Sequence, residues 1–131
     1  MSQQPLKKLN AAQLIDLAHE ESDCAECAAC TKEKFKSWSN ISLEVKSNIS
    51  PVGEFEDAEA DIKKNAYTEL HPNGSNYWSA DAPIAIHFYP YHESKINLCK
   101  ECKAVLLTYT EFAGHAPQHR IRYVDKDLIV D

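Results

Sequence analysis

All five cysteines of the chain lie in two short clusters, and this arrangement constrains the fold more than any other feature of the sequence. The first cluster holds Cys24, Cys27 and Cys30, and the second holds Cys99 and Cys102, about 70 residues later. A C-x-x-C pair supplies two thiolates, whereas a tetrahedral zinc site needs four ligands. The second cluster therefore needs partners from elsewhere in the chain. The sequence predicts that the two clusters meet around one ion.

We expect the ligands of a structural Zn²⁺ to be Cys24, Cys27, Cys99 and Cys102. Cys27 and Cys30 form a second C-x-x-C pair, so Cys30 in place of Cys24 is the alternative. An odd number of cysteines in two clusters favours a metal in a reducing compartment over a disulfide framework. A thioredoxin-like redox pair is disfavoured because neither cluster opens a helix in a βαβ unit.

The second cluster also has the spacing of a zinc finger with two cysteines and two histidines, which would use Cys99, Cys102, His115 and His119. That fold needs a helix carrying both histidines. Gly114 and Pro117 disfavour a helix there, and the residues after Cys102 favour a strand. We therefore prefer the four-cysteine site, with the finger as its competitor.

The net charge and the length limit the classes of function that we expect. A chain of 131 residues predicts a single domain spanning residues 1–131. The net charge of -6 disfavours a surface that neutralises nucleic-acid phosphates and suits a basic partner better. The sequence has no charged-then-apolar leader and no apolar run of ~18 residues. We therefore expect a cytoplasmic protein with no membrane contact.

Hydrophobic periodicity predicts a helix over residues 10–21, with Asn10 and Gln13 as a capping pair. A second helical piece over residues 23–30 would carry the first cysteine cluster. Five segments read as strands by their alternation or by their β-branched residues: 41–45, 67–70, 84–88, 105–109 and 120–124. Turns are expected at 50–53 and 71–74, and the apolar tail 128–130 is expected to pack.

These patterns together predict an α+β fold. N-terminal helices would pack with a small, mostly antiparallel sheet, and the cysteines would form a zinc-ribbon-like cluster.

Sequence motifs of common enzymes are missing. The chain contains no H-E-x-x-H, no P-loop and no G-x-S-x-G, and its His19-x-Glu21 is followed too closely by Cys24 for a zinc deaminase. The sequence therefore predicts a protein without enzymatic activity. A hydrolase that uses histidines with zinc is a third alternative, after binding and nucleic-acid functions.

Five acidic residues fall within eight positions, which makes this stretch the first candidate for contact with a partner protein. They are Glu54, Glu56, Asp57, Glu59 and Asp61. A solvated face with no partner would give the same pattern. Charge complementarity with a basic surface would speed association.

The second half of the chain resembles a group of small bacterial proteins. The resemblance covers roughly residues 77–131 and is carried by Trp78 to Pro83, Tyr89-Pro90-Tyr91, Cys99, Cys102, Tyr109-Thr110-Glu111 and Arg120-Ile121-Arg122. The chain departs from the pattern at residues 113–115, which read Ala-Gly-His where a glycine pair and aromatics are expected. The resemblance implies an immunity protein that neutralises a secreted antibacterial toxin by binding it. The alternative is a zinc-ribbon module in nucleic-acid binding or transcription.

Overall fold

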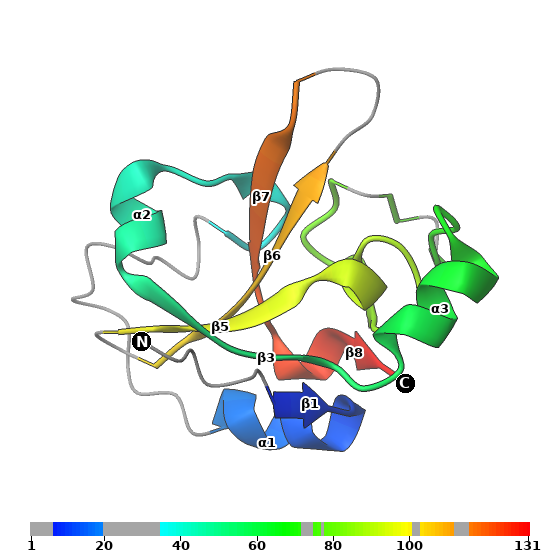
Figure 1. Ribbon diagram of the computed structural model, residues 1–131. Helices are drawn as coiled ribbons and strands as arrows, with labels where there is room; N and C mark the ends of the chain where they lie inside the picture. The colour runs from blue at the N-terminus through cyan, green and yellow to red at the C-terminus, as the bar shows by residue number, and fades with distance from the viewer. Residues whose placement is uncertain (1–6, 20–34, 72–74, 77, 101–102, 112–115) are drawn as a thin grey trace.

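A six-stranded sheet forms the centre of the computed structural model, which describes residues 7–19, 35–71, 75–76, 78–100, 103–111 and 116–131 (Figure 1). The strand order is β1-β3-β5-β6-β7-β2, and all neighbours are antiparallel except β1 and β3. The strands are β1 (Lys7–Leu9), β2 (Ser39–Asn40), β3 (Ile49–Phe55), β5 (Lys95–Cys99), β6 (Val105–Glu111) and β7 (Gln118–Tyr123). A separate parallel pair is formed by β4 (Ile84–Ala85) and β8 (Ile129–Val130).

Short helices connect these strands. They are α1 (Ala11–His19), α2 (Leu43–Ser47), α3 (Ala58–Asn65) and the 3₁₀ turns η1 (Tyr91–Glu93) and η2 (Lys126–Leu128). The predicted α+β class with a mostly antiparallel sheet is confirmed. Among the residues described, no helix has the length and apolar character needed to cross a membrane.

Helix α1 begins as its sequence predicts. The Asn10 amide donates to Gln13 Oε1 at 2.8 Å and the Gln13 amide donates to Asn10 Oδ1 at 2.9 Å, a reciprocal cap that satisfies two backbone donors. Leu14 is fully buried, and Ala11 and Ala18 are also buried. The predicted amphipathic helix is therefore confirmed as far as His19.

The two sides of the sheet are covered differently. Side chains on successive residues of a strand point to opposite sides, so Val105, Leu107 and Tyr109 of β6 pack with α1 in one core cluster. We call this the closed side. Leu106 faces the other side and packs with Phe35, Val45 and Ile121 in a second cluster. That side, which α2 covers only in part, is the open side (Figure 1).

Arg122 is fully buried and ties several segments to the sheet. Its guanidinium donates to the carbonyls of Lys36 at 3.1 Å, Ala80 at 3.2 Å and Ala82 at 2.8 Å, and to the Tyr91 hydroxyl. No carboxylate within the described ranges forms an ion pair with it. A buried charge must be solvated by fixed dipoles when it has no opposite charge, so Arg122 fixes the position of residues 80–82 against β7.

The strand predicted over residues 41–45 is wrong, because the chain begins helix α2 there. Ser42 caps that helix, accepting from the Val45 amide at 3.2 Å. Alternation predicted Leu43 and Val45 on one buried face, yet Leu43 is 85% exposed while Val45 is buried. Alternation over five residues is weak evidence, and the local cap decides the structure.

The turn predicted at residues 50–53 is also wrong, because these residues lie inside β3. The pairing register with β5 shifts between Pro51 and Gly53, so the proline occupies an irregularity of the ladder. A Cβ on Gly53 would lie 3.1 Å from the Lys7 carbonyl oxygen. Glycine at this position thus permits the close approach of β1, and the Pro-Gly pattern marks a bulge.

Two other predicted strands are wrong in whole or in part. Residues 68–70 have no regular structure, and Tyr67 lies in the turn after α3. Only Ile84 and Ala85 of the segment 84–88 form a strand, and it pairs with β8. Ile84, Ala85 and Ile86 are all buried, so the expected alternation of buried and exposed residues is absent. Residues 72–74 of the predicted hairpin turn lie outside the described ranges.

The strands predicted at 105–109 and 120–124 are confirmed as β6 and β7, and β6 lies in the sheet interior as expected. Leu128 and Ile129 of the apolar tail pack against the core as predicted. The sequence patterns missed β1, β5 and helix α3.

Candidate functional site

The predicted zinc site falls mostly outside the described part of the chain, because Cys24, Cys27, Cys30 and Cys102 lie in undescribed segments. Cys99 ends β5 and is fully buried beside the apolar side chains of the open-side cluster. Within the described ranges, no three Cys, His, Asp or Glu side chains are grouped to hold a metal. The four-cysteine site therefore stays a prediction.

The competing zinc finger conflicts with the structure at His119. That residue lies on strand β7, whereas the finger needs both histidines on a helix. Its Nδ1 lies 3.1 Å from the Thr110 hydroxyl on the neighbouring strand. His115 lies outside the described residues.

The acidic stretch 54–61 divides into paired and unpaired carboxylates. Glu54 pairs with Lys8 and, at 2.6 Å, with Lys95; the two lysines, Lys8 first, lower its pKa to about 2. Asp61 pairs with His87. Glu56, Asp57 and Glu59 are exposed, the last 3.7 Å from Lys63 one turn along α3.

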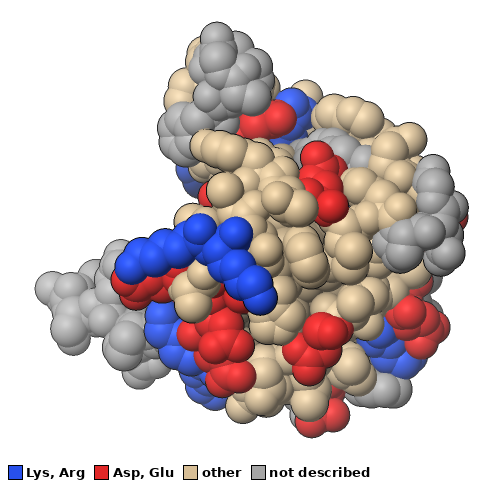
Figure 2. All heavy atoms as spheres, turned by 90° about the vertical axis from the view of Figure 1, so that its right-hand side faces the viewer, with Lys and Arg blue, Asp and Glu red and all other residues tan. Residues whose placement is uncertain are grey.

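The acidic stretch lines one wall of a cavity of about 300 Å³, which we call the acidic pocket. Four carboxylates and one histidine surround it, above an apolar floor of Leu9, Phe55 and Ile86. Its charged lining consists of Glu56, Asp57, Asp61, Asp131 and His87. The face of the molecule that carries α3 shows several separate Asp and Glu side chains with Lys and Arg between them (Figure 2).

His87 holds two carboxylates of this pocket together. Its Nδ1 lies 2.5 Å from Asp61 Oδ2 and its Nε2 lies 2.9 Å from Asp131 Oδ1. The bond to Asp131 and then that to Asp61 raise the pKa of His87, against partial desolvation that lowers it. In the charged form both ring nitrogens donate, so neither has a lone pair to accept a proton from a substrate. The arrangement suits a pair of ionic bonds from His87 to Asp61 and Asp131, which we call the ionic clasp, better than a catalytic general base.

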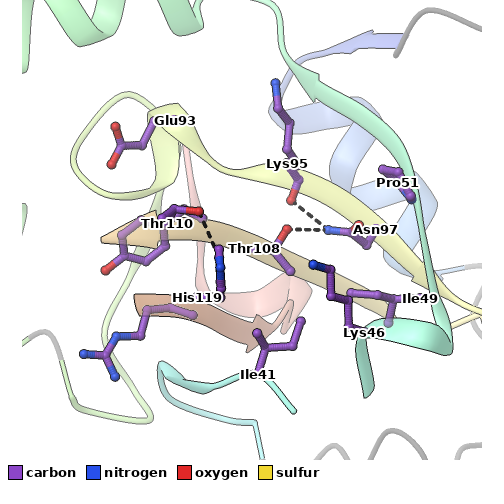
Figure 3. Close-up of a pocket in the computed structure, with 12 residues that line it drawn as sticks. Ile41, Lys46, Ile49, Pro51, Glu93, Lys95, Asn97, Thr108, Thr110 and His119 are labelled. Atoms are coloured by element: carbon purple, nitrogen blue, oxygen red, sulfur yellow. Dashed lines mark hydrogen bonds between the residues drawn. The ribbon is translucent and has the colours of Figure 1, made fainter. Parts of the chain in front are cut away.

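A larger concavity of about 540 Å³ lies on the open side of the sheet, and we call it the groove (Figure 3). Alternate residues of β5, β6 and β7 form its polar floor: Lys95, Asn97, Thr108, Thr110 and His119. Ile41, Ile49 and Pro51 form an apolar wall, and Lys46 of α2 and Glu93 of η1 stand at its ends. Burial raises the pKa of the Glu93 carboxyl.

Asn97 fixes the polar floor of the groove. It is almost fully buried, and its Nδ2 donates to the Thr108 hydroxyl at 2.9 Å and to the Lys95 and Leu106 carbonyls at 3.2 and 3.3 Å. Sequence reasoning missed the groove. The pattern that could have indicated the groove is the change from Leu106 to Thr108 and Thr110 at alternate positions of β6. This change marks the point along the strand where the open side is no longer covered by other residues.

An exposed aromatic residue that is not part of the groove lining lies beside Arg120 of β7. Trp78 is 56% exposed, and the Arg120 guanidinium carbon lies 5.4 Å from its ring centroid. Tryptophan and arginine are enriched among residues that dominate binding energy at protein interfaces.

None of the protein families, curated proteins and solved structures that were compared with this chain matches it.

Proposed function

We propose that this is a cytoplasmic immunity protein that binds and neutralises a cognate secreted antibacterial toxin, with the acidic pocket as its docking site. The observation that supports the proposal most is that four acidic residues line one concave pocket, together with the apolar Leu9, Phe55 and Ile86 of its floor. Such a pocket fits the long side chain of a basic residue on the toxin. The charged end of that side chain would meet carboxylates, while its methylene stem would lie against the apolar floor.

The charges around the pocket favour a cationic partner. Glu56 and Asp57 are exposed, and among the residues described neither makes an ion pair. His87 supplies at most one positive charge against four carboxylates, so the field of the pocket stays negative. With a net charge of -6 for the whole chain, this field would attract a basic surface and speed encounter.

A growth assay with matched charge reversals tests this function. The protein is expressed in a bacterium together with the product of the adjacent gene, if that gene encodes a toxin, and growth is measured. We expect the wild type to rescue growth and the double variant Glu56→Lys with Asp57→Lys to fail. The control reverses two exposed acids elsewhere, Asp81→Lys with Asp127→Lys, and should still rescue growth.

The same variants give a binding readout. Association of the purified pair should slow as salt rises, and the pocket variant should bind at least ~100-fold more weakly, a loss of about 2.7 kcal/mol. Equal rescue and equal affinity for both double variants would refute the pocket as the docking site. A protein that rescues no growth but is retained on heparin in a salt-dependent way would instead have the nucleic-acid function.

We further propose that zinc stabilises the scaffold and takes no part in binding. Phe35 and Cys99 belong to one buried cluster, and Phe35 follows Cys30 by only five residues in the sequence. This short separation supports a meeting of the two cysteine groups. Metal analysis of Cys102→Ser should show loss of zinc together with a lower melting temperature. His119→Ala is the control and should keep its zinc, and full zinc content in Cys102→Ser would refute the site.

A further inference from the structure

The groove on the open side holds three hydrogen-bond donors that face one region, and this arrangement is independent of the acidic pocket. The Lys46 side chain reaches from α2 toward Thr108 and His119 (Figure 3). Lys46 is exposed, and no carboxylate within the described residues pairs with its ammonium group. It is therefore a cation available to a ligand in the groove.

The floor supplies the other two donors. The Thr108 oxygen already accepts from Asn97 Nδ2 at 2.9 Å, so its hydroxyl hydrogen remains available to a ligand. When the Thr110 hydroxyl donates to His119 Nδ1, which lies 3.1 Å away, the imidazole carries its hydrogen on Nε2. Ammonium, hydroxyl and imidazole N–H together form a donor set for an anion.

The remaining lining restricts which anion fits. Ile41, Ile49 and Pro51 give the groove an apolar wall, which suits a ligand with an apolar body. The carboxyl of Glu93 lies at the end opposite Lys46 and repels added negative charge when ionised (Figure 3). Among the described Lys and Arg residues that line the groove, Lys46 alone makes no ion pair, since Lys95 pairs with Glu54 and Arg120 with Glu111. One cation facing a carboxylate across the groove favours a monoanion over a phosphate dianion. The cavity of about 540 Å³ lies within the usual range for sites that bind small molecules.

We propose that the groove binds a small organic carboxylate, with the carboxylate held by Lys46, Thr108 and His119 and its apolar body against Ile41, Ile49 and Pro51. The occupant is a small molecule. Glu93 orients it, because the anionic end must lie away from the Glu93 carboxyl.

Benzoate is a suitable probe, and two-dimensional ¹H–¹⁵N NMR of the full chain is the readout. We expect saturable shifts of the Thr108, Thr110 and His119 amide signals with a Kd of about 1 mM. Benzamide has the same shape without the charge and should bind at least ~5-fold more weakly. Inorganic phosphate tests the competing anion class, and tighter binding of phosphate at the same amides would overturn the carboxylate assignment.

Four variants test the roles of the side chains. Lys46→Met should weaken benzoate binding ~5-fold or more, whereas Lys46→Arg should retain it. Glu93→Gln should strengthen binding ~2- to 5-fold, because it removes a like charge. Lys126→Met, which changes an exposed lysine outside the groove, should have no effect. Shifts that do not saturate, equal binding of benzoate and benzamide, or an unchanged affinity in Lys46→Met would each refute the proposal.

Discussion

Two regions of this protein satisfy their ionisable side chains in opposite ways. In the interior, Arg122 and His92 are bonded to backbone carbonyls and have no charged partner among the described residues. At the periphery, His87, Glu54 and Arg120 are bonded to side chains of opposite charge. The interior groups are held by backbone dipoles, and these dipoles do not change with salt or pH. The peripheral groups are held by side chains whose attraction depends on their charge.

The difference separates the parts of the molecule that carry stability from those available for binding. Removing Arg122 leaves the carbonyl of the buried Ala82 without this donor, and that cost is large. Removing a member of an exposed ion pair costs little, because water solvates the group that is left. The exposed carboxylates Glu56 and Asp57 can therefore be changed to test binding with small loss of stability.

The largest expected effect comes from Arg122→Met. Methionine fills the space of the side-chain stem but leaves the carbonyls of Lys36, Ala80 and Ala82 without their donors. We expect the free energy of unfolding to fall by roughly 3 kcal/mol or more, measured by urea denaturation. Arg120→Met is the matched control two residues along β7. Its side chain and that of Glu111 are 14% and 18% exposed, so losing the pair should cost about 1 to 2 kcal/mol, less than the loss in Arg122→Met. Equal losses in the two variants would contradict the distinction.

His92→Phe gives the next largest effect and tests the second interior group. His92 is 1% exposed, its Nε2 donates to the Ala66 carbonyl at 2.7 Å, and its Nδ1 has no hydrogen-bond partner among the described residues. Burial lowers the pKa of His92, against smaller raising contributions from the Ala66 bond and Asp61. Phenylalanine should cost about 1 to 3 kcal/mol at pH 8, because the Ala66 carbonyl loses its donor.

The pH dependence distinguishes this histidine from those at the surface. Because its folded pKa is below the ordinary value of 6.5, the wild type loses stability from His92 as pH falls below 6.5. Denaturation curves at pH 8 and pH 5 should therefore show a smaller gap between His92→Phe and wild type at pH 5. A gap that widens at pH 5 would contradict a neutral, buried His92.

His87→Asn should show the opposite pH dependence with a smaller effect. The folded pKa of His87 is above 6.5, so its clasp with Asp61 and Asp131 contributes fully below pH 6.5 and is lost as pH rises through the raised value. We expect a loss of about 1 kcal/mol at pH 5.5 and less at pH 9, measured by urea denaturation. A loss that is the same at both pH values would contradict the ionic clasp.

The parts of the fold that the sequence predicted are those with strong local patterns. The reciprocal cap of Asn10 and Gln13 sets the start of α1, and the β-branched and leucine-rich run after residue 104 forms β6. The strand prediction for residues 41–45 was wrong because five alternating residues fit a strand, while the Ser42 cap favours one turn of helix. The turn prediction for residues 50–53 was wrong because proline and glycine occur at bulges as well as at turns.

The candidate sites were harder to predict because their residues are distant in the sequence. Asp61, His87 and Asp131 are separated by 26 and 44 positions, and only the packing of α3 and the C-terminal strand brings them together. The acidic stretch was found from composition alone. Composition did not indicate that Glu54 and Asp61 are paired within the fold while Glu56 and Asp57 face outward.

Glu54→Gln should have the smallest effect on the free energy of unfolding among these variants, and it tests the ion pairs of Glu54 at the periphery. Glu54 joins Lys8 of β1 to Lys95 of β5, and these lysines are largely exposed, at 61% and 51%. The folded pKa of about 2 lies below the ordinary value of 4.5, so the wild type keeps this contribution above pH 4.5 and loses it as pH falls toward 2. We expect Glu54→Gln to cost less than ~1 kcal/mol at pH 7 in low salt and almost nothing in 1 M NaCl, measured by urea denaturation. Among the described strands, β1 pairs with β3 alone. A loss of stability that does not change with salt would mean that Glu54 holds β1 by packing, and the charged periphery would then resemble the interior.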